Sequence, residues 1–374
     1  TGCEGESRPR RESVRKARVG ENAHVEELAR EPTHDLENES PEALYAFLDE
    51  RQWGDGLPVV APTGDRVEEM LAGGDPGADP DEVLAVLPPR GGAATRRTVA
   101  VNAVMAGCPP GVFPVVVTAV RALGQQRLNL RGVNATTHPV APLVIVHGEA
   151  VAEMGFNAEV GAFGPGNRAN ATVGRAVRLV LLHVAGARPG PGDAATQGQP
   201  SKYAYCTAEN AAASPWGPYH HDLGVDAPSA VTVHCGENPH NFHDMESDDV
   251  ERILAKAASA MTTFGVNNAC ISSGEWFVGL CPEHAATAAA AGWSRDDVAE
   301  HLFATARRPA REFRAQFDLL AWAPWMRDAA DDDLLPMTEE AGNIRVFVTG
   351  GAGRHSCVIP SWGMTRSVTL ALEA

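Results

Sequence analysis

Three stretches rich in β-branched residues each run into glycine: Val144–Gly148 (VIVHG), Val231–Gly236 (VTVHCG) and Val346–Gly351 (VFVTGG). Runs of this kind, closed by glycine, predict buried β-strands. The second stretch continues as Glu237–Asp244 (ENPHNFHD) and the third as Ala352–Cys357 (AGRHSC). Since α/β proteins build their sites in the loops at strand ends, histidines gather where a site is expected. The pattern predicts an α/β fold.

The first two strand segments share an order of strand, histidine, glycine, long loop and helix. This order indicates an internal duplication, although any two βα units look alike to this extent. We predict two related α/β halves, residues 39–190 and 191–374, with the site in a cleft between them. Residues 186–228 are expected to form an irregular connecting loop, and residues 1–38 a flexible N-terminal arm.

Local signals place several helices. Ser40 before Pro41 is a helix start, and Ser294–Asp297 fits a capping box. The apolar segment Phe113–Leu123 suits either a buried helix or a strand, and periodicity does not decide between them.

Composition limits the class of protein. The chain has 374 residues and a formal net charge of -17, which disfavours nucleic acids and anionic membranes as partners. The basic stretch Arg8–Arg18 resembles neither a signal peptide nor a membrane anchor, and no run approaches the roughly 18–20 apolar residues of a spanning helix. Seven cysteines without a Cys-x-x-Cys pair favour a reducing environment. We therefore expect a cytoplasmic protein, and a homo-oligomer.

The Gly-rich loop Gly164–Asn170 (GPGNRAN) resembles an anion cradle. Its glycines allow close backbone approach, a helix begins directly after it, and Arg168 can bind a carboxylate or phosphate at two points. The alternative is a tight turn with asparagine caps and a surface arginine. The spacing matches neither a Walker nor a Rossmann fingerprint, so no nucleotide cofactor is expected.

Two cysteines precede proline at apparent helix starts. Cys108 and Cys281 occupy positions where a helix N-terminus lowers the pKa of a thiol. Cys108 follows small residues and is the better candidate nucleophile or ligand. The alternative is that both are inert core residues, as free cysteines commonly are.

Histidines from three segments are candidate metal ligands. His138 precedes the first strand, His240 lies in the second loop, and His355 lies in the third. Three histidines on three loops suit the open-sided coordination of Zn, Fe, Cu or Mn. The same residues also suit metal-free acid–base catalysis, or a purely structural role.

Four strings together resemble a poorly characterised bacterial family of similar length, which we associate with UGSC-type thiol or selenol proteins. They are Trp53–Thr63, Asn102–Cys108, Gly166–Ala176 and Ala195–Tyr203. The resemblance covers roughly residues 45–365. It implies a common fold and a shared site around Cys108 and residues 167–172, but no known reaction. The chain lacks the Cys-Gly-Ser-Cys string of that family name.

These signals predict an enzyme that acts on a small anionic or polar metabolite by metal-assisted or Cys/His-dependent chemistry, of the lyase or hydrolase type. The predicted catalytic residues are Cys108, His138, His240 and His355. The predicted substrate-binding residues are Asn134, Asn167, Arg168, Asn170, Thr172, Lys202 and Glu209. The alternatives are a non-catalytic protein that binds a small ligand or a redox partner, and a structural subunit of an oligomer.

Overall fold

A mixed four-stranded sheet forms around the first strand segment. The computed structural model describes residues 34, 36–38, 40–268, 274–317, 322 and 324–373. The strands of this first sheet are β3 (Ala141–Gly148), β4 (Cys206–Ala208), β5 (Ser229–Gly236) and β12 (Val368–Ala371), in the order β12-β5-β3-β4. Strand β3 is parallel to β4 and antiparallel to β5, which is antiparallel to β12.

A second four-stranded sheet contains the third predicted strand. Its strands are β6 (His240–His243), β7 (Trp276–Leu280), β10 (Ile344–Val348) and β11 (His355–Pro360), in the order β10-β7-β11-β6. Strand β7 is parallel to β10 and antiparallel to β11, and β11 is antiparallel to β6. Each sheet therefore has one parallel pair at one edge and antiparallel pairs elsewhere.

The two sheets pack face to face through alternate residues of their strands. Leu143 and Ile145 of β3 share one buried cluster with Phe277 of β7 and Phe347 of β10. Because successive side chains point to opposite faces of a strand, the intervening residues Val144 and Val146 face outward, where they pack on helices.

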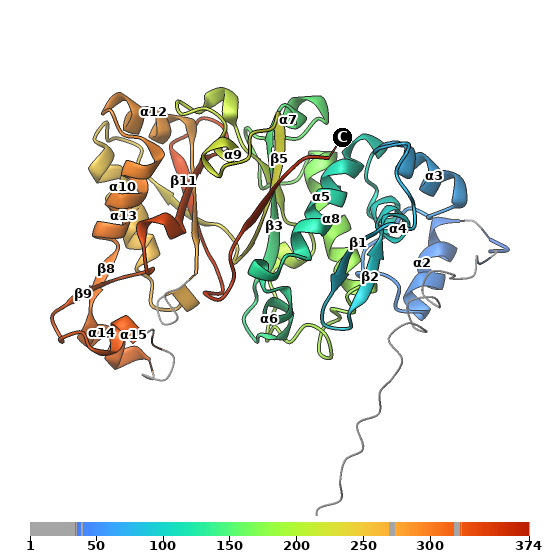
Figure 1. Cartoon of the computed structure of the whole chain (residues 1–374), viewed down its shortest axis with the longest axis horizontal. Helices are drawn as coiled ribbons and strands as arrows, with labels where there is room; N and C mark the ends of the chain where they lie inside the picture. The colour runs from blue at the N-terminus through green and yellow to red at the C-terminus, as the bar shows by residue number, and fades with distance from the viewer. Residues whose placement is uncertain are drawn as a thin grey trace, which may run out of the picture. The chain divides into compact units, whose positions relative to one another are not determined.

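Helices cover the outer face of each sheet. The first sheet carries α5 (Phe113–Leu123) and α8 (Arg168–His183), and α4 (Arg96–Ala106) packs on these two helices. The second sheet carries α10 (Val250–Met261), α12 (Pro282–Ala290) and α13 (Arg295–Thr305). The layers are thus helix, sheet, sheet, helix (Figure 1). The α/β class is confirmed. The strands β3, β4 and β5 of the first sheet are largely buried, whereas His240, Asn241 and His243 of the edge strand β6 in the second sheet are exposed.

Shorter elements complete the described chain. The helices are α2 (Pro41–Glu50), α3 (Gly64–Ala72), α6 (Leu130–Ala135), α7 (Ala150–Glu153), α9 (Tyr219–Asp222), α14 (Ala310–Gln316) and α15 (Pro324–Arg327), and the two-stranded ribbons are β1 (Val83–Leu87) with β2 (Gly92–Thr95) and β8 (Arg307–Pro309) with β9 (Leu334–Pro336). The predicted starts are confirmed, since the Ser40 side chain accepts from the Ala43 N–H and Ser294 forms a capping box with Asp297. Phe113–Leu123 is a helix.

The two sheets repeat one connection pattern. In the first, the chain passes from β3 through α8 to the parallel β4, and then to the antiparallel β5. In the second, it passes from β7 through α12 and α13 to the parallel β10, and then to the antiparallel β11. The pattern supports an internal duplication, but with β3 equivalent to β7. The alignment of β3 with β5 that the sequence suggested is wrong, because β5 is the antiparallel neighbour of β3.

The last strand of each repeat lies in the other sheet. Strand β6 follows β5 in the chain but pairs with β11, and β12 follows β11 but pairs with β5. The predicted boundary at residue 190 falls within the first sheet, because it lies between β3 and its partners β4 and β5. Residues 37–374 form one compact unit.

The predicted arm, residues 1–38, lies almost entirely outside the described residues. Among the residues that are described, no helix combines the length and the apolar character needed to cross a membrane.

Candidate metal centre

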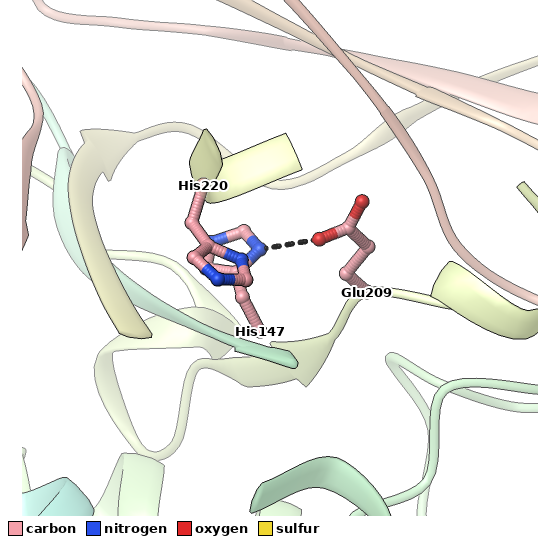
Figure 2. Close-up of side chains that lie close together, drawn as sticks. All are labelled: His147, Glu209 and His220. Carbon is pink, nitrogen blue, oxygen red and sulfur yellow. Dashed lines mark hydrogen bonds and ion pairs between the residues drawn. The ribbon is translucent and has the colours of Figure 1, made fainter. Parts of the chain in front are cut away.

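Three buried side chains meet between the sheets at the end of β3. His147 is near the C-terminal end of β3, Glu209 directly follows β4, and His220 lies on α9. Their exposed fractions are 0%, 1% and 0%, and one ligand atom from each lies within 4.8 Å of the others. Figure 2 shows the two imidazole rings side by side, with the carboxylate directed at one of them.

The strand register explains the meeting of His147 and Glu209. Val146 and Ala208 are partners in the parallel pair, so the next residue of each strand lies on the inner face at the same level. The Glu209 N–H extends the ladder by donating to the Val146 oxygen. Gly148 then turns the chain with a φ of +77°, and a Cβ atom at that position would collide with the Pro228 oxygen. Glycine is therefore needed immediately after the histidine.

Both nitrogens of His147 are held. Nδ1 lies 2.7 Å from Oε2 of Glu209, and Nε2 lies 2.8 Å from the Thr232 hydroxyl. Thr232 in turn lies 2.8 Å from the Thr369 hydroxyl of β12. A chain of hydrogen bonds therefore runs from the Glu209 carboxylate to strand β12, which follows β11 in the chain but pairs with β5.

His220 has one nitrogen without a partner. Its Nε2 lies 2.8 Å from the backbone oxygen of Ala227, so Nε2 carries the proton and Nδ1 presents a lone pair. This Nδ1 atom is buried and has no hydrogen-bond partner. Burial lowers the pKa of His220, which keeps the ring neutral at neutral pH. A buried, unpaired lone pair is costly unless something binds it.

Arg295 supplies the compensating positive charge. It is 5% exposed at the start of α13, and its Nη2 lies 3.3 Å from Oε1 of Glu209. The Tyr219 N–H also donates to this carboxylate, at 2.8 Å. The Arg295 guanidinium lies over the Tyr219 ring and bonds to Asp222. The Glu209 carboxyl group is therefore held by donors from three residues, His147, Tyr219 and Arg295.

This donor set fits a divalent transition metal. Two imidazoles and one carboxylate are ligands for zinc and for non-haem iron, and both sets leave further positions open. The Nε2 atoms of both histidines have outer partners that fix the ring orientation, as metal-ligating histidines usually do. An ion would replace the proton that His147 Nδ1 shares with Glu209, since metal ligands must be deprotonated.

The predicted metal set of His138, His240 and His355 is not brought together. In the part of the chain that the structure describes, only His147, Glu209 and His220 bring three potential metal-ligand atoms within 4.8 Å of one another. The strand partner of His355 is His243, three residues from His240, which places His240 about 10 Å farther along β6. His138 instead pairs with Glu237, at 2.8 Å from Nε2 to Oε1.

The three strand-end loops meet only in part. The Gly350 N–H donates to the Ala158 oxygen, which joins the first loop to the third. Because β5 is antiparallel to β3, the loop after β5 begins at the opposite end of the first sheet. His234 faces Leu143, about 13 Å along β3 from His147.

Cys108 and the predicted anion cradle do come together. The Arg168 Nε donates to the Gly107 oxygen at 2.9 Å. A hydrogen bond with Thr172 and the positive charge of Arg168 both favour a lower pKa for the Cys108 thiol. The dominant influence is nevertheless burial, which raises the pKa of Cys108 to about 12. The lowered thiol pKa predicted from the sequence is wrong for Cys108, and also for Cys281, whose pKa is raised for the same reason.

We expect the Cys108 thiol to be inert in the folded protein. With a pKa near 12, the thiolate fraction at pH 8 is about one in ten thousand. Iodoacetamide should leave Cys108 unmodified under native conditions and modify it in urea, as read by peptide mass spectrometry. Native labelling as fast as in urea would contradict this prediction.

The cradle asparagines serve the loop itself. Asn167 caps α8 by accepting from the Asn170 N–H. The Asn170 amide donates to the oxygens of Asn157 and Ala162 and accepts from the Asn157 N–H. Their polar atoms therefore hold the loop closed, and Arg168 remains the exposed cation beside it.

The other predicted substrate residues lie elsewhere. Asn134 and Lys202 line one small pocket together with Arg178. Lys202 and Arg178 share the buried carboxylate of Asp193, at 2.8 and 3.2 Å. Glu209, predicted as a substrate-binding residue, is part of the candidate metal centre. From the sequence we select neither His147, which lies at the end of the first predicted strand, nor His220, which lies in the irregular segment 186–228.

No protein-family model matches this chain, and no curated protein matches it either. The resemblance to UGSC-type proteins therefore stays a prediction.

Proposed function

We propose that the protein binds a divalent transition metal ion through His147, Glu209 and His220, and uses it in hydrolase- or lyase-type chemistry on a small polar or anionic metabolite. The observation that carries the proposal is the buried lone pair of His220 Nδ1 beside a fixed carboxylate. When bound, such an ion polarises a carbonyl or phosphoryl oxygen and makes bound water more acidic.

The surrounding residues would prepare the site without taking part in a reaction. Thr232 holds the His147 ring through Nε2, and the Ala227 oxygen holds His220 in the same way. Arg295 and the Tyr219 N–H hold the Glu209 carboxyl group in place. An ion beside Arg295 favours oxygen-rich or negatively charged ligands.

A second candidate is a structural metal site. The full burial of all three side chains favours it, because closed sites are typical of structural zinc. It predicts that removal of the metal lowers the melting temperature without abolishing any activity. The catalytic proposal predicts in addition an activity that chelation removes and added metal restores.

The test compares two adjacent histidines in protein purified without a histidine tag. His220→Ala removes the unpaired Nδ1, whereas His221→Ala changes an exposed neighbour and serves as the control. We expect about one equivalent of metal in the wild type and in His221→Ala, and roughly tenfold less in His220→Ala, by elemental analysis. Equal metal content in all three proteins would refute the proposed site.

A further inference from the structure

An exposed pair of histidines lies at the free edge of the second sheet. His243 of β6 and His355 of β11 are direct partners in the antiparallel pair, and both are exposed. Their ring centres are 5.3 Å apart. Strand β6 is the last strand on this side of its sheet.

The separation of the rings fits shared coordination of one ion. A metal lies about 2.0–2.1 Å from an imidazole nitrogen, so two imidazoles on one tetrahedral ion have ring centres about 5 Å apart. Partners in an antiparallel pair have Cβ atoms about 5 Å apart, so the strands hold the rings at this spacing without rearrangement.

The hydrogen bonds leave suitable lone pairs. His355 Nδ1 lies 3.0 Å from the amide oxygen of Asn241, so Nδ1 carries the proton and Nε2 is free to bind a metal. Among the described residues, no hydrogen bond to either ring nitrogen of His243 is found. The adjacent Arg354 is turned away, bonding to the Ser247 oxygen and to Asp248.

We propose that His243 and His355 form a second, surface site for a divalent transition metal such as Cu²⁺, Ni²⁺ or Zn²⁺. Imidazole suits all three ions, and the net charge of -17 attracts cations to the protein. The site is independent of the buried one and shares no residue with it.

The site has a mechanical consequence. Strand β6 belongs to the first repeat and β11 to the second. An ion bound by His243 and His355 therefore links β6 to β11 in the second sheet. An ion that binds only the folded state stabilises it, and the stabilisation grows with the ratio of the free ion concentration to the Kd. We therefore expect added metal to raise the melting temperature.

The test is a Cu²⁺ titration of the full chain by calorimetry at pH 7.5, after treatment with a chelator. His243→Ala and His355→Ala are compared with His240→Ala, which removes an exposed histidine of the same strand whose partner is Val358. We expect the first two variants to weaken binding roughly tenfold or more and to lose the metal-induced rise in melting temperature. His240→Ala should behave as the wild type.

Unchanged Cu²⁺ affinity in both His243→Ala and His355→Ala would overturn the proposal, as would an equal loss in His240→Ala. Circular dichroism checks that each variant is folded. The metal that copurifies with the same variants reports the buried site separately, so failure at one site is not mistaken for failure at the other.

Discussion

Glu209→Ala is expected to lower the free energy of unfolding by about 3 kcal/mol or more, even without metal. The substitution leaves Arg295 buried beside the space vacated by its carboxylate partner, 3.3 Å away. It also removes the acceptor of the buried Tyr219 N–H and the partner of His147 Nδ1. Urea denaturation in the presence of EDTA measures this loss.

Glu209→Gln is the matched control for the charge. Its amide oxygen still accepts from the Tyr219 N–H and its volume is nearly unchanged, so its loss in stability should be smaller than that of Glu209→Ala. Both variants should lose metal, because an amide is a poor substitute for a carboxylate ligand. A loss below about 1 kcal/mol for Glu209→Ala in EDTA would show that the buried charge is compensated in another way.

Three of the strands were predictable because their signal is local. Val144–Gly148 falls within β3, Val231–Gly236 within β5, and Val346–Val348 within β10. Runs of β-branched residues closed by glycine are a property of the segment itself. The helix starts at Ser40 and Ser294 were predictable for the same reason.

The pairing of the strands was not predictable from the same signals. β5 ends in histidine and glycine as β3 does, yet it runs in the opposite direction beside it. Direction and partner depend on contacts far apart in sequence. Strand β6 begins at His240, just after β5 ends at Gly236, yet it joins the other sheet.

The candidate centre was missed because both faces of the first sheet are buried. His147 ends the continuous apolar run Leu143–Val146, which is typical of a strand buried on both faces, so the sequence is compatible with a structural histidine in the core. Here the inner face packs on the second sheet, so the polar residues His147, Thr232 and Glu209 meet in the interior. Glu209 was selected from the sequence, but its role was assigned to substrate.

Removal of the C-terminal strand provides the strongest test of the exchanged topology. A chain ending after Ser367 lacks β12, and with it the ladder to β5, the buried side chain of Val368, and the ion pair between Glu373 and Arg121. We expect a loss of several kcal/mol in the free energy of unfolding, since the inner strand β5 becomes an edge strand with unpaired backbone groups.

The strands that lose stability in the truncated chain are more informative than the total loss of unfolding free energy. The deleted residues follow β11 in the chain, but the structure places them beside β5. Hydrogen exchange should therefore show the greatest loss of protection in β5 and β3, and a smaller loss in β7 and β10. Loss confined to the second sheet would contradict the exchange of strands.

Thr369→Val distinguishes the contribution of the Thr369 hydroxyl from that of strand β12 as a whole. The variant keeps a β-branched side chain and the ladder to β5, but it removes the bond from Thr369 to Thr232, which holds His147. We expect protection of β5 to be retained and metal affinity at the buried centre to fall, because outer partners of metal-ligating histidines contribute to affinity. If truncation lowers metal content while Thr369→Val leaves it unchanged, the C-terminal strand supports the centre through packing alone.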